Sequence, residues 1–110
     1  MDRVSCSGVR GVWRYSELLP VEKQHRVDIG AGGTPLVRVS ELGKAIGVRN
    51  LYVKNDTVNP TFSFKDRPAS VAVSKAKEFG ITTVGCASTG NLASATLAHA
   101  TAAGLTGFVL

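Results

Sequence analysis

The sequence predicts an α/β fold in which βαβ units build a parallel sheet. Short runs rich in β-branched residues alternate with longer helical patterns, which is the order that a parallel sheet requires. Glycines follow the expected helices, where a left-handed residue commonly ends a helix. A chain of 110 residues is also long enough to enclose a core of its own. Right-handed crossovers between the strands are therefore expected.

The N-terminal half is expected to contain only short elements. Residues 1–33 are irregular in pattern, apart from a short helix at 15–19 that Pro20 ends. The GAGG run at residues 30–33 is typical of a flexible segment. Beyond it the pattern predicts, in order, a strand after Pro35, a helix at 41–46 capped by Ser40 and closed by Gly47, and a strand at 51–54.

The C-terminal half is predicted to repeat strand and helix at longer spacing. Pro68 suits the first turn of a helix, because an N–H at that position would have no intrahelical partner. We expect this helix at 67–79, a strand at 81–87, an alanine-rich helix that ends at Gly104, and a last strand at 107–110. The last strand is apolar, so we expect an uncovered edge that is prone to self-association.

The charge balance and the cysteines argue against several classes of function. The formal net charge is +5, yet the basic residues stand singly, so we expect a solvated surface and no nucleic-acid partner. No apolar run approaches the ~20 residues that a membrane span needs. The N-terminus lacks the apolar core of a signal peptide, so a cytoplasmic location is expected. Cys6 and Cys86 match no metal or disulfide spacing, and Cys86 is predicted to be buried in its strand.

A lysine stands at the predicted start of the 67–79 helix, in the stretch NPTFSFKDRP. The helix dipole disfavours a positive charge at that end, and Phe62 and Phe64 could remove water from Lys65. Both effects favour the uncharged amine, which is the form that condenses with a carbonyl group. Residues that violate local preferences cluster at functional sites. The residues alone leave a second interpretation open, in which Lys65 is an exposed lysine and Asp66 offsets its unfavourable interaction with the dipole.

A second candidate site is the turn that follows the predicted strand at 81–87. Ser88, Thr89, Gly90 and Asn91 offer hydroxyls, an amide and backbone N–H groups at the start of the alanine-rich helix. Ligands of open α/β sheets bind at such strand ends, so this turn could hold a carboxylate or a phosphate. Plain helix capping by Ser88 or Thr89 is the alternative that the residues leave open.

NPTFSFKDR, followed after one helix by ASTGN, resembles the pyridoxal-phosphate enzymes of fold type II, the tryptophan-synthase-β-like family. GGTPLVRV and LYVKND precede these motifs in the family's order, so the resemblance covers residues 30–110. It implies a two-domain α/β architecture with pyridoxal 5′-phosphate in the cleft between the domains. It also implies that residues 1–60 contribute to the larger domain, that residues 61–110 begin the smaller one, and that the full enzyme is a homodimer.

The resemblance implies a role for each residue of the two motifs. Lys65 would be the catalytic residue, which binds the cofactor's aldehyde covalently and later moves protons as a free base. Asn91 would hydrogen-bond the ring hydroxyl of the cofactor. Ser88, Thr89, Gly90 and Asn91 would form the substrate-binding turn that holds the α-carboxylate. The implied lyase reaction converts O-phospho-L-homoserine and water into L-threonine and phosphate.

The resemblance also implies parts of the cofactor site that this sequence does not contain. In the family, the loop that binds the cofactor's phosphate and the residue that faces the pyridine nitrogen come far downstream of the lysine. We therefore expect an N-terminal fragment that is inactive alone. Two alternatives stay open: another enzyme of the fold, such as a threonine/serine dehydratase or a cysteine synthase, and a non-catalytic module that binds an anion or a partner.

The residues near the two motifs, and the histidines, are expected to play other parts. Asp66 and Arg67 are expected to be structural, and Phe62 and Phe64 are expected to pack. His25 and His99 are expected to be non-catalytic.

Overall fold

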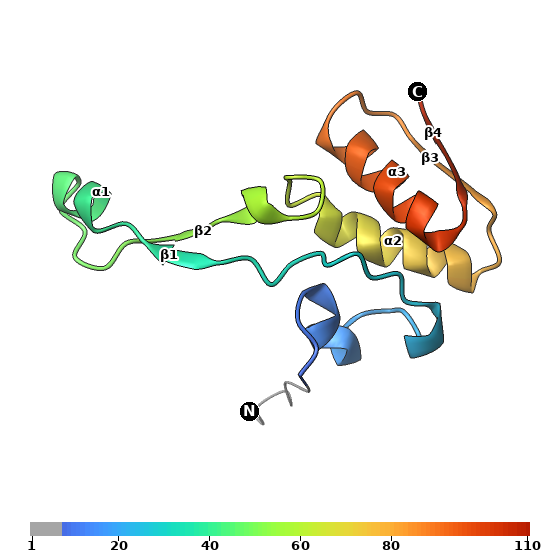
Figure 1. Cartoon of the computed structure of the whole chain (residues 1–110), viewed down its shortest axis with the longest axis horizontal. Helices are drawn as coiled ribbons and strands as arrows, with labels where there is room; N and C mark the ends of the chain where they lie inside the picture. Colours follow the sequence, from blue (N-terminus) through green and yellow to red (C-terminus); the bar gives the residue numbers. More distant parts are fainter. Residues whose placement is uncertain (1–7) are drawn as a thin grey trace.

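The computed structural model describes residues 8–110, and Figure 1 shows how the elements are arranged. The helices are α1 (Ser40–Ala45), α2 (Asp66–Glu78) and α3 (Asn91–Ala103), and 3₁₀ helices occupy Val12–Leu18, Lys23–His25 and Asp56–Val58. The strands are β1 (Leu36–Arg38), β2 (Tyr52–Lys54), β3 (Thr83–Cys86) and β4 (Thr106–Val109). Within the described residues, no helix is both long enough and apolar enough to cross a membrane.

The C-terminal half forms the predicted parallel βαβ unit. β3 and β4 pair in parallel, α3 connects them, and α2 packs along α3 (Figure 1). Two glycines make room for neighbouring side chains, one within the sheet and one between the sheet and α3. A Cβ at Gly85 would lie 2.4 Å from Phe108 Cζ on the paired strand, and a Cβ at Gly107 would lie 2.7 Å from Leu97 Cδ2 on α3. Mixed α/β structure with a parallel sheet is thus confirmed for this half of the chain.

The prediction of a parallel sheet is wrong for β1 and β2, which pair antiparallel in a separate sheet. Val39 N donates to Leu51 O at 3.0 Å and extends their ladder, and Val48 N donates to Gly43 O at 2.8 Å. The residues between the strands therefore close into a compact loop. The only residue that α1 buries is Gly43, so α1 lacks the apolar face that a crossover helix packs on a sheet. β1, α1 and β2 form an arm that extends away from α2 and α3 (Figure 1).

The N-terminal segment packs against α2 through a small core. Trp13 is 3% exposed, and its Nε1 donates to Val27 O at 3.2 Å. Val27 O also accepts from Ser70 Oγ at 3.1 Å, and Val27 N donates to Ser74 Oγ at 2.9 Å. Ser74 of α2 thus gives the buried Val27 N–H an acceptor, and Ser70 gives the Val27 carbonyl a second donor beside Trp13. The buried members of the core are Val12, Trp13, Val21 and Ala31, with Leu19 and Val71 packed against them.

Within the GAGG run at residues 30–33, Ala31 belongs to this core and Gly32 is held beside it, which corrects the expectation of a flexible segment at these two residues. Ala31 is fully buried, and its carbonyl accepts from Val12 N at 2.7 Å. Gly32 N donates to the side chain of Asn59 at 2.8 Å. Gly32 has a φ of +84°, so glycine serves here as the residue that adopts a left-handed conformation in a crowded place.

Gly32→Ala is expected to lower the free energy of unfolding by about 2 to 4 kcal/mol. The new Cβ would lie 2.9 Å from both Arg67 Nη1 and Val12 N, in addition to its unfavourable φ. Urea unfolding measures the loss. Gly30→Ala is the matched control, because its φ of +91° is also positive but nothing lies within 4 Å of its Cβ. We expect the control to lose about 1 kcal/mol, and equal losses would contradict the close approach at Gly32.

Three further sequence predictions concern the last strand, the two cysteines and the cap of α1. β4 packs against α3 at Gly107, so it is only partly uncovered. Phe108 is 45% exposed, and Leu110, which follows the strand, is 80% exposed. Cys86 lies in β3 but is only half-buried, so the prediction of a buried cysteine is wrong in degree. Cys6 lies outside the described residues. Ser40, the predicted N-cap, is instead the first residue of α1.

Candidate functional site

Lys65 is the N-cap residue of α2, as the sequence predicts. The chain before it turns tightly, since Phe62 N donates to Asn59 O at 2.8 Å and Asp66 N donates to Ser63 O at 3.3 Å. Phe62 has a φ of +60°, a left-handed conformation that costs a residue other than glycine about 1 to 2 kcal/mol. Strained backbone of this kind clusters at functional sites.

The Lys65 ammonium makes no ion pair with any residue in the part of the chain that the structure describes. Its Nζ lies 4.7 Å from the centroid of the Phe64 ring, and the residue is half-buried. Two other lysines differ: Lys44 pairs with Glu41 at 2.8 Å, and Lys75 pairs with Glu78. An amine that no carboxylate holds is available to react with a carbonyl carbon.

The residues just before Lys65 line a depression of about 320 Å³ that also includes Asn91. Asn91 is the first residue of α3, so the packing of α3 on α2 brings the two sequence motifs to one place. Lys65 does not line the depression itself, but its ammonium lies over the ring of Phe64, which does. Phe62 and Phe64, which were expected to pack, are 80% and 54% exposed and form part of the wall. The other lining residues are Val53, Lys54, Asn55, Asp56, Thr57 and Ser63.

Asp66 follows Lys65 in the sequence and is fully buried. Its Oδ2 accepts from Thr61 N at 2.8 Å and from Thr61 Oγ1 at 2.9 Å. Its Oδ1 lies 3.2 Å from Nε2 of His99, which is also fully buried. The prediction that Asp66 is structural is confirmed, and His99 has a partner that the sequence did not reveal.

Arg67 holds the loop that lines the depression. Its Nη2 donates to Asp56 Oδ1 at 2.9 Å and to Thr34 Oγ1 at 3.0 Å, and its Nε donates to Asp56 Oδ2 at 3.2 Å. Asn59, which is 2% exposed, donates from Nδ2 to Asp56 O at 2.8 Å. Arg67 is therefore structural, as predicted. A bidentate ion pair of this kind fixes orientation as well as distance.

The ion pair predicts an acid-dependent part of the stability. Hydrogen bonds from Arg67 and then Thr34 lower the pKa of Asp56 from 3.8 to about 2. The ionised carboxylate therefore stabilises the fold fully above pH 3.8, and this stabilisation is lost as the pH falls from 3.8 to about 2. Because the side chain is 28% exposed, we expect about 1 to 2 kcal/mol. Asp56→Asn should remove this pH dependence, which urea unfolding between about pH 2 and pH 6 measures.

The control for this prediction is Glu41→Gln. Glu41 pairs with Lys44 on the surface, where its side chain is 86% exposed, so its loss should leave the acid dependence unchanged. If Asp56→Asn and the unaltered chain lose stability equally between pH 3.8 and about pH 2, the ion pair does not contribute as described.

The turn at residues 88–91 leads into α3 without a side-chain cap. The N-cap residue is Gly90, so capping by Ser88 or Thr89, the alternative left open by the sequence, is not what the structure has. Ser88 Oγ instead accepts from Gly90 N at 3.3 Å. Thr89, Gly90 and Asn91 are exposed, and of the four turn residues only Asn91 lines the depression beside Lys65.

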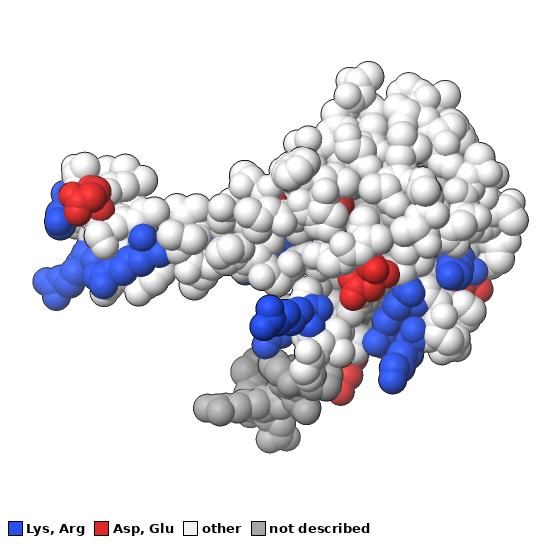
Figure 2. Space-filling model, viewed as in Figure 1, with Lys and Arg blue, Asp and Glu red and all other residues white. Residues whose placement is uncertain are grey.

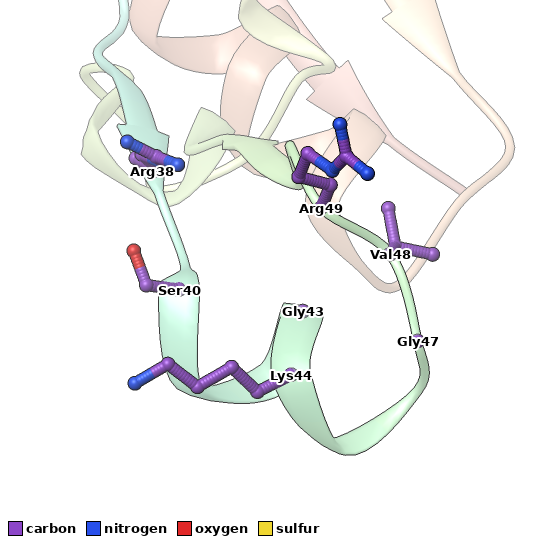
Figure 3. A pocket seen from close by; sticks show the side chains of 7 residues that line it. All are labelled: Arg38, Ser40, Gly43, Lys44, Gly47, Val48 and Arg49. Carbon is purple, nitrogen blue, oxygen red and sulfur yellow. The ribbon is translucent and has the colours of Figure 1, made fainter.

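A second depression of about 510 Å³ lies at the tip of the arm (Figure 3). Arg38, Lys44 and Arg49 stand around it, but Arg38 donates to Asn50 and Lys44 pairs with Glu41. It includes none of the predicted site residues. Figure 2 shows the lysines and arginines of this face in separate groups, one of them over the arm tip. The smaller depression is therefore the better candidate site, because it unites both motifs.

Sequence reasoning missed the partners that support this site. Asp56 lies 11 residues from Arg67, and His99 lies 33 residues from Asp66. No local spacing links residues so far apart. The one sequence signal was the Asp-Arg pair after Lys65, which was expected to be structural but did not reveal its partners.

Comparison with known proteins gives a consistent result. Residues 27–110 match the family model described as pyridoxal-phosphate dependent enzyme. The chain is 47% identical over 108 residues to a threonine synthase of Methanocaldococcus jannaschii, covering 94% of this chain and 27% of that protein. It is 50% identical over 99 residues to a threonine synthase of Methanosarcina acetivorans, covering 90% of this chain and 24% of that protein. The chain thus spans about a quarter of the length of these curated relatives.

Proposed function

We infer the function from the premise that this chain belongs to the pyridoxal-phosphate-dependent enzyme family. We propose that it carries the lysine-bearing part of a threonine synthase, a lyase that converts O-phospho-L-homoserine and water into L-threonine and phosphate. One observation carries the proposal: Lys65, which makes no ion pair with the described residues, lies at the start of α2 with its ammonium over Phe64, and Phe64 lines a depression together with Asn91. The names of the relatives support this choice within the family.

The described residues fit the cofactor. Pyridoxal phosphate needs an amine for its aldehyde, and Lys65 offers one that makes no ion pair with residues 8–110. It also needs a hydrogen-bond donor for its ring hydroxyl, and the Asn91 amide stands in the same depression as Ser63 and Phe64. When bound, the cofactor supplies an electron sink for the carbanion formed at the substrate's α-carbon.

The residues of this chain would then move protons, bind the substrate and keep the site in place. Lys65 Nζ would accept the α-proton of the substrate and return protons later in the reaction. Ser88 and Thr89 hydroxyls and the Gly90 N–H would hold the α-carboxylate, together with Asn91. The N-terminus of α3 favours this placement, because its dipole and its first N–H groups attract an anion. Asp66 and Arg67 would keep the lysine and the loop in place.

The larger setting is part of the same proposal. We propose the two-domain fold type II architecture, with residues 1–60 contributing to the larger domain and residues 61–110 beginning the smaller one. A homodimer and a cytoplasmic location belong with it. The separate sheets that β1 forms with β2 and that β3 forms with β4 support this division.

The test is a comparison of substrates with the natural polypeptide that carries these residues, loaded with pyridoxal phosphate. O-phospho-L-homoserine should yield equal amounts of L-threonine and phosphate. Formation of 2-oxobutyrate from L-threonine, with no phosphate released from O-phosphohomoserine, would instead identify a dehydratase. Formation of cysteine from O-acetylserine and sulfide would identify a cysteine synthase. No turnover of any of these by a folded, cofactor-loaded protein would favour a non-catalytic module.

A further inference from the structure

A buried hydrogen bond joins α2 to α3 at the residue that follows the candidate lysine. Asp66 Oδ1 and His99 Nε2 are 3.2 Å apart, and both side chains are fully buried. Asp66 is the first residue of α2 and the neighbour of Lys65. His99 lies in α3, the helix that begins with Asn91. The bond therefore connects the two helices whose first turns carry the two site motifs.

The partners of the pair determine which atom donates. Burial lowers the pKa of His99 more than its hydrogen bond to Asp66 raises it, so the ring is neutral at neutral pH. Asp66 Oδ2 already accepts twice from Thr61, and Nδ1 of His99 has no hydrogen-bond partner among the described residues. A neutral ring that faces a carboxylate must place its proton on Nε2. The pair is therefore a directional N–H donor to a carboxylate, which is stronger than a neutral hydrogen bond.

The rest of the α2–α3 contact is made by small side chains. The residues that α3 buries, besides His99, are Ala93, Ala95, Thr96 and Ala100. On α2, Ala69 and Val73 line one cavity together with Thr96 of α3. The buried Ser70 and Ser74 of α2 instead bond to Val27 in the N-terminal segment. Contacts between small apolar groups are non-directional, so they stabilise the packing without strongly selecting one position of α3 along α2. A buried hydrogen bond with a required geometry can select that position.

We propose that Asp66 and His99 are a positioning pair that sets Lys65 against Asn91. The inference rests on the proposed function of Lys65, and it assigns to His99 a role in the site although His99 does not touch it. Without the His99 donor, the Asp66 carboxylate would remain buried with only the two hydrogen bonds from Thr61. The start of α2 would then rearrange to bring that carboxylate to water, because an unsatisfied buried charge is costly.

The first test measures the helix positions and needs no cofactor. Spin labels at Ala72→Cys and Ser94→Cys, which are exposed positions on α2 and α3, report the distance between the helices in a Cys6→Ser, Cys86→Ser background of the natural polypeptide. His99→Leu should broaden or shift the distance distribution. His99→Gln, whose side-chain N–H can reach the place of Nε2, should restore it. An unchanged distribution in His99→Leu would overturn the proposal, whether or not Lys65 binds pyridoxal phosphate.

The second test follows the lysine itself. The rate at which pyridoxal phosphate becomes fixed to Lys65 by borohydride should fall about 10- to 100-fold in His99→Leu and recover in His99→Gln. If the Asp66–His99 pair were only structural, the loss of fixation rate in His99→Leu would follow the unfolded fraction measured by circular dichroism. His99→Gln would then not recover the rate at equal stability. Either result would overturn the positioning role. Absence of fixation in the unaltered protein would refute the proposed function instead, and the spin-label distances would still decide the role of the pair.

Discussion

Replacing Lys65 with alanine is expected to lower the turnover of O-phospho-L-homoserine by at least about 10²- to 10⁴-fold. Lys65 is the residue proposed both to bind the cofactor and to move the α-proton, so its loss removes two contributions at once. The measurement is phosphate release by the natural polypeptide that carries these residues. The fold should be little affected, because Lys65 is the N-cap of α2 and makes no capping hydrogen bond through its side chain.

Two matched variants serve as controls for this prediction. Lys77→Ala removes an exposed lysine from the last turn of the same helix and should leave turnover unchanged. Lys65→Arg keeps the positive charge but removes the reactive amine, so it should be as inactive as Lys65→Ala. Turnover in Lys65→Ala within about tenfold of the unaltered protein would contradict the assigned role, because one proton transfer alone contributes more than that.

Trp13→Ala is expected to lower the free energy of unfolding by about 3 to 5 kcal/mol, the largest stability loss we predict for a single residue of this chain. Trp13 is 3% exposed, fills the core between the N-terminal segment and α2, and donates to Val27 O. Its removal leaves a cavity and an unpaired carbonyl lone pair. Urea unfolding followed by far-ultraviolet circular dichroism measures the loss.

The control for this prediction lies in the same 3₁₀ helix. Leu18 is 72% exposed, so Leu18→Ala should change the stability by less than about 0.5 kcal/mol. A comparable loss in both variants would show that the segment around Trp13 does not form the core described. A small loss in Trp13→Ala alone would lead to the same conclusion.

The part of the fold that the sequence predicted well is the part whose signals are local. Pro68 near the start of α2, and Gly80 and Gly104 after α2 and α3, mark helix ends through backbone conformation alone, and both glycines have the expected positive φ. The β-branched run of β3 and the alanine-rich pattern of α3 then left only a parallel βαβ unit. In such stretches local preference and tertiary structure agree.

The parts that the sequence did not predict depend on contacts between distant residues. The direction of β2 relative to β1 depends on whether α1 covers the sheet, which is a property of packing and not of helix length. The burial of Ala31 likewise depends on another segment, because Val12 N donates to its carbonyl. Its neighbour Gly32 is held by the distant Asn59. Residues 8–29 carry no strong periodicity, so Trp13 gave no indication that it forms a core with α2.

The candidate site likewise contains residues that local motifs predicted and partners that they did not. Lys65 and Asn91 were predicted from their motifs, and the structure adds that they adjoin one depression. The roles of Lys65, Ser88, Thr89, Gly90 and Asn91 stay predictions. The division into residues 1–60 and 61–110 stays a prediction as well. Asp66 was predicted to be structural, but its partner His99 could not be, because 33 residues separate them.

The most direct test of this account is to treat the natural polypeptide with pyridoxal phosphate, reduce it with borohydride, and map the modified peptide by mass spectrometry. The account predicts a single pyridoxyl group on Lys65, at the start of α2. Modification of another lysine, or no modification of a chain shown to be folded and to bind the cofactor, would contradict the assignment of Lys65 as the cofactor lysine.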